Sequence, residues 1–532
     1  MSAQVRVAWL AGYALATFGA FPHPLAGSVV DLGWALAWLA PACLVAGLRG
    51  LAPGPAARAG FAAGLAAHAA IFHWIYVVTV DYGHAPPPVG VLAAVALAVY
   101  PAALTAAFAA GCAWFGHRAI PNPWLAAALW AALDHARSFL LTGFPWAVLG
   151  YAQHANAPLL ALAPYTGVWG LSFVTALGGV ALADAIASAP ARRARALAAL
   201  AGVVALHAAG ALDAARDAGD PPARVRVAVL QGNIDQGVKW SPEWATRTLE
   251  IYEELTRRAA GRGAQVVVWP ETAVPGSPDA SPELAERLAG LARETGTTLV
   301  AGAVGLEPRR DGSDLRYFDS AFVVAASGEA PPRYDKSHLV PFGEYLPFRE
   351  LFGHFIEAVA RGVADTDVSA GAGPRGLAIP LGGSAGAPRV LTAGVPICYE
   401  LLFPSLVRRF VEGGAEALLA ITNDAWYGRT GAPYQFLAIT ALRSAENRVW
   451  TARAANTGVS AFIDHRGRVR AQTEIFERDL LVADLPLRPA PSGGSFYTRH
   501  GDLFAAACWA AVAGAAVHRL RAERMRVRRE RA

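Results

Sequence analysis

The chain of 532 residues contains few cysteines and none of the common cofactor motifs. Its four cysteines do not form CxxC pairs or metal-ligand spacings, which argues against a disulfide framework and against a zinc site. They are Cys43, Cys112, Cys398 and Cys508. The sequence also has no GxxxxGK[ST] motif and no GxGxxG motif between a strand and a helix, so nothing indicates nucleotide binding. We therefore expect no cofactor and no metal.

Charged residues are scarce as well, and their scarcity is uneven. Only 16% of the residues are charged and 54% are hydrophobic, which is too apolar for an ordinary soluble protein. Residues 1–212 are almost free of charge, residues 213–500 have a mixed composition, and residues 503–518 are apolar again before a basic end. We predict a transmembrane domain (1–212), a linker (213–223), a globular domain (224–500), a last transmembrane helix (501–519) and a basic cytoplasmic tail (520–532).

Apolar segments of helical length predict about eight transmembrane helices. Most of them reach the roughly 20 residues that span a bilayer, whereas the first, seventh and eighth are marginal. Their approximate bounds are 6–21, 28–48, 59–80, 88–115, 123–141, 159–187, 196–212 and 503–519.

Positive charges in the loops predict the orientation of these helices. Basic residues lie after the second, fourth, sixth and eighth segments, while the intervening loops hold almost none, with Arg137 as the main exception. Because positively charged loops remain in the cytoplasm, both termini are expected there and residues 213–500 on the outer side. The basic tail resembles a nucleic-acid patch in composition, but beside a membrane span it is better explained as an anchor on anionic lipid. We therefore expect membrane lipids as partners and no nucleic acid.

The globular domain shows alternating strand and helix patterns, which favour a layered α/β fold. Strands are expected at 224–230, 265–269, 298–304, 320–325, 390–397, 417–422, 450–455 and 460–464. Helices are expected at about 241–260, 281–295, 404–412 and 433–448.

Three reactive side chains in this domain each follow an apolar, strand-like run: Glu271, Lys336 and Cys398. Taken singly, each has an ordinary explanation, namely a solvated carboxylate, a surface lysine paired with Asp335, or an inert buried thiol. Cys398 is, however, the only cysteine of the domain. The chain has only two lysines, Lys239 and Lys336, in a composition that otherwise uses arginine, so a retained lysine hints at a need for a compact ammonium group.

The order Glu, Lys, Cys, together with the residues around it, carries a family resemblance. Residues 224–485 resemble the nitrilase (carbon–nitrogen hydrolase) superfamily, and the whole chain is similar to the apolipoprotein N-acyltransferase family of the bacterial inner membrane. The matching motifs are Gln231-Gly232-Asn233, Lys239-Trp240, Trp269-Pro270-Glu271-Thr272, Tyr334-Asp335-Lys336, Pro341-Phe342-Gly343-Glu344, Cys398-Tyr399-Glu400, Asn423-Asp424-Ala425-Trp426 and Arg453-x-x-Asn456-Thr457-Gly458.

The resemblance implies an αββα sandwich outside the cytoplasm and a role for each reactive residue. Glu271 would be the general base, Cys398 the nucleophile, and Lys336 would stabilise the oxyanion. Glu344 and Glu400 would fix Lys336 and the incoming amine, although an ordinary buried charge pair is the alternative. The supporting residues at the substrate entrance and beside the nucleophile would be Trp240, Trp426 and Tyr399.

The same resemblance implies a reaction and its partners. A phospholipid, preferably phosphatidylethanolamine, would give its sn-1 acyl chain to Cys398 as a thioester. The N-terminal α-amine of a diacylglyceryl-cysteine apolipoprotein would then accept the chain, which completes lipoprotein maturation. The enzyme would act as a monomer in the bacterial inner membrane, with its catalytic domain in the periplasm.

Two other functions remain open from the sequence. A membrane-tethered amidase or lipid hydrolase would share the three residues but use water as acceptor. A non-catalytic membrane scaffold with a nitrilase-like domain would not need them, and their presence together argues against it.

Overall fold

In the computed structural model the chain forms two compact units. The structure describes residues 1–117, 119–187, 190–216, 223–239, 241–308, 314–326, 332–347, 368–381, 390–488 and 493–531. One unit consists of Met1–Tyr76, Gly90–Asp217 and His500–Ala532, and the other of Val77–Val89 and Ala218–Arg499. The second unit thus includes Val77–Val89, a segment within the stretch that the sequence assigned to the membrane. Most of the expected linker, 217–222, lies outside the described residues.

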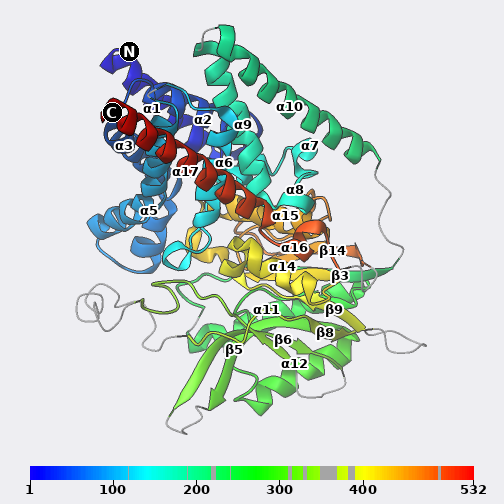
Figure 1. The fold of residues 1–532 in the computed structure, drawn as a ribbon. Coiled ribbons are helices and arrows are strands. Elements are labelled where there is room, and N and C mark those ends of the chain that lie inside the picture. The colour runs from blue at the N-terminus through cyan, green and yellow to red at the C-terminus, as the bar shows by residue number, and fades with distance from the viewer. Residues whose placement is uncertain are drawn as a thin grey trace. The chain divides into compact units, whose positions relative to one another are not determined.

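The first unit is helical (Figure 1), and its helices follow the apolar segments of the sequence. The longer ones are α1 (Ala3–Gly19), α2 (Gly33–Leu48), α3 (Pro53–Ile71), α5 (Pro87–Phe115), α6 (Pro123–Ala136), α9 (Val168–Ala187), α10 (Pro190–Ala215) and α17 (Leu503–Arg531). Short elements between them are β1 (His23–Leu25), β2 (Ser28–Val30), α4 (Trp74–Tyr76), η2 (Leu140–Thr142), η3 (Leu149–Gln153), α7 (Ala157–Leu160) and α8 (Ala163–Thr166). The short helix η1 (Val77–Tyr82) belongs to the second unit.

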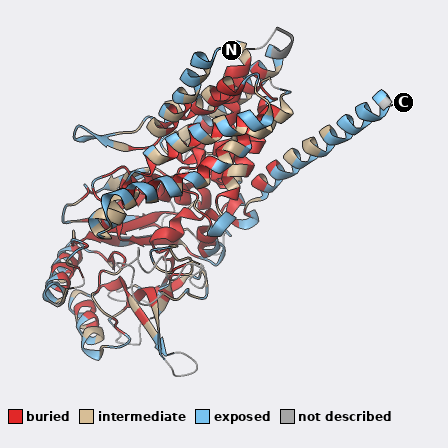
Figure 2. Ribbon diagram, turned by 90° about the vertical axis from the view of Figure 1, so that its left-hand side faces the viewer, coloured by how far each residue is buried: buried red, intermediate tan, exposed pale blue. Residues whose placement is uncertain are grey.

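Helix α9 is the centre of this helical unit. It packs against α2, α6 and α10, and most of its residues are buried. Small residues permit the close approach: a Cβ at Gly179 would lie 2.3 Å from the main-chain oxygen of Trp38 on α2. Such small-residue contacts are typical of helix pairs in membranes. Helix α17, by contrast, is exposed along most of its length (Figure 2).

The expected eight spans are only partly matched by the described helices. Four are long and apolar enough to cross a membrane: Pro87–Phe115, Val168–Ala187, Arg193–Ala215 and Leu503–Glu530. A fifth span is possible only if Pro53–Ile71 and Trp74–Tyr82, which meet at a 55° bend, are counted as one. Helices α1, α2 and α6 have 17, 16 and 14 residues and fall short of a span by length. The seventh and eighth segments, expected to be marginal, meet the criterion because their helices extend beyond the apolar run.

The second unit contains two six-stranded sheets. The first sheet has the strand order β14-β3-β4-β5-β6-β7, and the second has the order β13-β12-β11-β10-β9-β8. The first comprises β3 (Arg224–Gln231), β4 (Val266–Val268), β5 (Thr298–Pro308), β6 (Leu315–Val324), β7 (Arg333–Asp335) and β14 (Asp479–Pro486). The second comprises β8 (Leu377–Pro380), β9 (Val390–Gly394), β10 (Ala417–Thr422), β11 (Thr451–Ala455), β12 (Ala461–Ile463) and β13 (Val469–Gln472).

Helices cover the outer faces of both sheets, so the unit has four layers. Helix α11 (Pro242–Gly261) packs on β3 and β14, and α12 (Pro282–Thr295) packs on β6. On the other sheet, α14 (Pro404–Glu412) packs on β9 and against α15 (Ala432–Asn447), while β3 and β11 contact each other between the sheets. Short helices η4 (Cys398–Leu402), η5 (Asp424–Tyr427) and α16 (Phe496–His500) complete the unit (Figure 1). The expected αββα sandwich is confirmed.

The sequence located the buried strands and the four long helices that the structure describes in this unit to within a few residues. Strands β7, β8, β13 and β14 were missed. Strand β13 is polar and mostly exposed, and β7 has only three residues, so neither shows the hydrophobic alternation that marks a strand.

The core of the first sheet offers a test of this packing. Trp269 is fully buried, stacks on Tyr252 with ring centroids 5.0 Å apart, and donates from Nε1 to Thr256 Oγ1 at 3.0 Å. We expect Trp269→Ala to cost about 3–5 kcal/mol of stability, because it leaves a large cavity. Trp269→Phe should cost less, since it keeps the ring contact and loses the hydrogen bond. Thermal unfolding of the full chain in detergent measures both, and equal losses would contradict this account.

Candidate functional site

The reactive residues lie where strands of both sheets end. Glu271 follows β4, Lys336 follows β7, Cys398 follows β9, and Asn423 follows β10. Strands β9 and β10 run parallel, so their carboxyl ends lie at the same edge of the sheet. The sandwich therefore brings together Glu271 and Lys336, which are 65 positions apart in the sequence.

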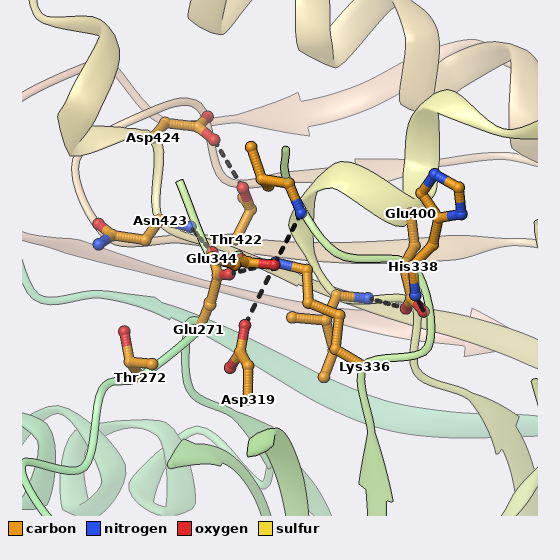
Figure 3. Close-up of polar contacts among 12 residues, drawn as sticks. Glu271, Thr272, Asp319, Lys336, His338, Glu344, Glu400, Thr422, Asn423 and Asp424 are labelled. Carbon is orange, nitrogen blue, oxygen red and sulfur yellow. Dashed lines mark hydrogen bonds and ion pairs between the residues drawn. The ribbon is translucent and has the colours of Figure 1, made fainter. Parts of the chain in front are cut away.

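Lys336 is the centre of the site and is completely buried. Its Nζ lies 3.1 Å from Glu271 Oε1 and 3.3 Å from Asp319 Oδ2, and it also donates to Glu344 Oε1 (Figure 3). A buried ammonium ion is stable only if its hydrogen bonds and its charge are satisfied. Three carboxyl groups surround this one, so its position is strongly fixed.

The four groups shift one another's protonation. Burial lowers the pKa of Lys336, but the carboxylates of Glu271, Glu344 and Asp319 outweigh burial and raise it well above its usual value. Burial raises the pKa of Asp319, and the neighbouring Glu271 raises it further. Burial also raises the pKa of Glu344, which Lys336 offsets only in part. For Glu271, Lys336 and the hydrogen bond with Asp319 overcome burial, so its pKa lies below the usual value. Glu271 is therefore ionised at neutral pH.

Glu271, Asp319 and Glu344 also place oxygen atoms within 4.8 Å of one another, as a metal site would. Lys336 Nζ contacts all three carboxyl groups. A divalent cation would have to displace this ammonium or share the space with it against like-charge repulsion. The residues present therefore fit a lysine-centred cluster better than a metal centre.

Cys398 begins a tight turn at the end of the buried run. Its φ angle of 46° is in the left-handed region, which is strained for a residue with a side chain and is frequent at functional sites. The residue is only 8% exposed. Burial raises the pKa of its thiol well above the usual value, the Glu271 carboxylate raises it further, and Lys336 opposes them. The resting pair is thus a thiol beside a carboxylate, which is the protonation state that general-base chemistry requires.

Glu400 holds the lysine loop and the cysteine turn together. Its Oε1 accepts from Tyr334 Oη at 2.6 Å and from Ser337 N and Oγ, both at 2.8 Å. Its Oε2 accepts from Ile397 N at 2.9 Å, directly before Cys398. Burial raises the pKa of Glu400. Glu400 thus acts on the residues after Lys336 and before Cys398, whereas Glu344 contacts Lys336 itself.

The second oxygen of Glu271 is fixed by the end of β10. Oε2 accepts from Asn423 N at 2.6 Å, and the Asn423 side chain donates to Gln236 Oε1 at 2.7 Å. Next to it, Asp424 Oδ2 accepts from Arg453 Nη2 at 2.7 Å in a fully buried ion pair. These bonds leave Glu271 little freedom to rotate away from Lys336.

Aromatic side chains surround the cysteine turn. The Tyr399 ring lies 5.7 Å from His338 and 5.2 Å from Phe403. Trp426 is 38% exposed and packs edge-to-face against Tyr82 of η1, with centroids 5.9 Å apart. Trp240, the other expected aromatic at the entrance, lies outside the described residues.

Sequence reasoning missed two members of the cluster. Asp319 lies in the buried half of β6, shortly before the apolar run Ala321–Val324, and an acid at that place was the available signal. Lys239 appeared in a motif but received no role, and in the structure its Nζ lies 3.3 Å from the main-chain oxygen of Glu271.

Family models match both parts of the chain. The carbon-nitrogen hydrolase family matches residues 226–490, and the apolipoprotein N-acyltransferase N-terminal domain matches residues 13–181. A curated apolipoprotein N-acyltransferase of Geobacter metallireducens is 41% identical over 493 residues, covering 91% of this chain and 90% of its own. The Nitrosomonas europaea protein of that name is 35% identical, covering 80% of this chain and 82% of its own.

The chain belongs to the apolipoprotein N-acyltransferase family. Among solved structures, an amidase from Nesterenkonia sp. is similar at 22% identity, with a TM-score of 0.36, covering 49% of this chain and 90% of that one. The carbon-nitrogen hydrolase match covers the part of the chain that contains Glu271, Lys336 and Cys398. The N-terminal domain match covers most of the helical part.

Glu400 provides a test of the site's construction in this family member. Both oxygens of Glu400 accept hydrogen bonds, one from Ser337 N and the other from Ile397 N. Glu400→Gln replaces one oxygen by an NH₂ group, which faces one of these N–H donors whichever way the amide is turned. We expect a loss of about 1–3 kcal/mol in stability and a change in the alkylation rate of Cys398. Thermal unfolding and mass spectrometry after iodoacetamide treatment measure these effects.

The matched control is Glu412→Gln on α14. Glu412 forms an exposed ion pair with Arg408 at 2.8 Å, and such pairs contribute about 0–1 kcal/mol. A Glu400→Gln protein as stable as this control would show that Glu400 does not hold the two loops together.

Proposed function

We propose that the protein transfers an acyl chain from a phospholipid to the N-terminal α-amine of diacylglyceryl-cysteine apolipoproteins. The observation that carries the proposal is the buried Lys336–Glu271 pair, whose charges act on the thiol of Cys398. The chain that contains this pair is 41% and 35% identical to two curated apolipoprotein N-acyltransferases over most of its length.

In the first half-reaction Cys398 attacks the sn-1 ester of the phospholipid. Glu271 accepts the thiol proton as sulfur bonds to the carbonyl carbon. A lowered pKa at Glu271 and a raised pKa at Cys398 give the carboxylate–thiol pair that this step starts from. When the tetrahedral intermediate collapses, the lysophospholipid oxygen takes the proton back from Glu271, and the acyl chain remains on sulfur as a thioester.

Lys336 stabilises the oxyanion that forms in between. Its pKa is raised well above the usual value, so it remains an ammonium ion throughout the cycle. Its three carboxyl contacts hold the charge in position before the substrate arrives, and preorganised charge in a site with little water contributes most to such catalysis. Glu344 fixes Lys336 directly, and Glu400 fixes the adjoining loop.

In the second half-reaction the apolipoprotein amine attacks the thioester. Glu271 takes the proton that the amine loses, and the Cys398 thiolate leaves and is reprotonated. The acyl chain ends as an amide. Trp426, half-exposed beside Tyr82, would contact the acyl chain at the entrance.

Both substrates are anchored in lipid, which accounts for the helical part. We propose that all eight apolar segments cross or enter the bacterial inner membrane, with both termini in the cytoplasm and the sandwich in the periplasm. The basic end of α17 would rest on anionic lipid at the cytoplasmic face. The protein would need no cofactor and would act as a monomer.

Intact-mass spectrometry of the purified protein with phosphatidylethanolamine tests the reaction. We expect the wild type to gain one acyl chain and Cys398→Ala to gain none, because only the thiol forms the thioester. A diacylglyceryl-cysteine peptide added afterwards should remove the chain and become N-acylated.

Two results would favour the other functions. Loss of the chain to water at the same rate without peptide would indicate a lipid hydrolase. A wild type that gains no chain and behaves like Cys398→Ala would support a non-catalytic scaffold.

The proposed orientation has its own test. A membrane-impermeant maleimide should label Glu254→Cys, on an exposed position of α11, in cells whose outer membrane has been permeabilised. Arg529→Cys, on the exposed end of α17, should react only after the inner membrane is opened. The reverse labelling pattern would overturn the orientation.

A further inference from the structure

Both lysines of this arginine-rich chain lie in the site. Lys336 is the centre of the carboxyl cluster, and Lys239 is buried beside it with only 2% of its surface exposed. Lys239 Nζ donates to Thr272 Oγ1 at 2.6 Å and to the main-chain oxygen of Glu271 at 3.3 Å. Lys239 belongs to the segment after β3, and its ammonium group therefore joins that segment to the turn at Glu271 and Thr272.

We propose that Lys239 is a positioning residue for Glu271: it fixes the turn at Glu271 and Thr272, and its charge keeps Glu271 ionised and favours the Cys398 thiolate. This inference rests on the proposed function, because it assigns a role within that reaction.

The turn needs an external anchor. Thr272 has a φ angle of 49°, in the left-handed region that β-branched residues rarely adopt. The turn also packs tightly against β5, since a Cβ at Gly302 would lie 2.3 Å from the Pro270 carbonyl oxygen. The bond from Lys239 to the Thr272 hydroxyl holds the strained residue, and the adjacent Glu271 side chain then points at Lys336.

Lys239 adds a second positive charge to the cluster. Glu271, Asp319 and Glu344 face the single ammonium group of Lys336. Burial raises the pKa of Glu271, and the charge of Lys239 adds to that of Lys336 in lowering it. Burial lowers the pKa of Lys239, and Glu271, Asp319 and Cys398 are among the groups that oppose this shift.

The test measures the alkylation of Cys398 by iodoacetamide as a function of pH, in the full chain in detergent, with Cys398→Ala as background. Lys239→Met removes a positive charge that favours the thiolate, so the alkylation rate of Cys398 should fall at pH values below 8, where Lys239 is charged. At pH 7 the rate should fall about tenfold. The Glu271→Gln variant serves as a reference, because the difference between its profile and that of the wild type shows how far the alkylation rate depends on the Glu271 carboxylate.

Two variants separate charge from contact. Lys239→Arg keeps a positive charge, so its profile should lie near that of the wild type below pH 8. Thr272→Val keeps the charge of Lys239 and removes the 2.6 Å hydrogen bond that holds the turn, so its profile should move by clearly less than that of Lys239→Met. Burial lowers the pKa of Lys239 to about 8, so the wild type and Lys239→Met should converge above that pH. If Lys239→Met does not fold, Lys239→Gln replaces it.

A Lys239→Met or Lys239→Gln profile that superimposes on the wild type would overturn the proposal. A shift of equal size in Thr272→Val would overturn it as well, because contact alone would then explain the effect. Alkylation requires no acyl transfer, so this result is independent of the reaction. The acyl adduct formed from phosphatidylethanolamine in the same preparations tests the proposed function separately.

Discussion

The burial of one ammonium ion among three carboxyl groups constrains the rest of the α/β unit. Lys336 has no exposed surface, so its charge must be compensated by Glu271, Asp319 and Glu344 from three different segments. Removing a single partner from such a cluster leaves a charge uncompensated, which costs several kcal/mol. The strand ends and loops that carry these residues are therefore held in one arrangement, and the thiol of Cys398 lies in the electric field that results.

Rigidity around the cluster comes from main-chain N–H groups and neutral side chains that donate hydrogen bonds to its carboxylates. Glu400 joins the loop after Lys336 to the turn before Cys398, and Asn423 fixes the second oxygen of Glu271. Preorganisation of this kind suits a reaction in which charge develops on a carbonyl oxygen, because the site need not rearrange as the oxyanion forms. A thioester that must wait for an amine also benefits from a buried, dry site.

Much of this protein could be predicted from the sequence. The buried strands and the amphipathic helices show their periodicity directly, which indicated a layered α/β fold. The resemblance carried by the motifs around Glu271, Lys336 and Cys398 implied the sandwich and the three reactive residues. Four edge strands were not predicted: β7 and β13 have only three or four residues, most of them polar in β7, and β8 has only four residues, which are too few to show a period, whereas β14 is longer and was missed. The number of spans stays a prediction, since apolar composition does not reveal where a helix bends or ends, as at the 55° break after Ile71.

The sequence by itself determined which chemistry is available: one thiol and one carboxylate at strand ends, two lysines in a chain that otherwise uses arginine, and long apolar helices. Only the tertiary structure decided how these groups act on one another. Asp319 becomes part of the site because β6 pairs with β7, and Lys239 because the segment after β3 lies beside the Glu271 turn. The protonation states follow from burial and from distances of a few ångströms between residues far apart in the chain, and local sequence patterns do not specify such distances.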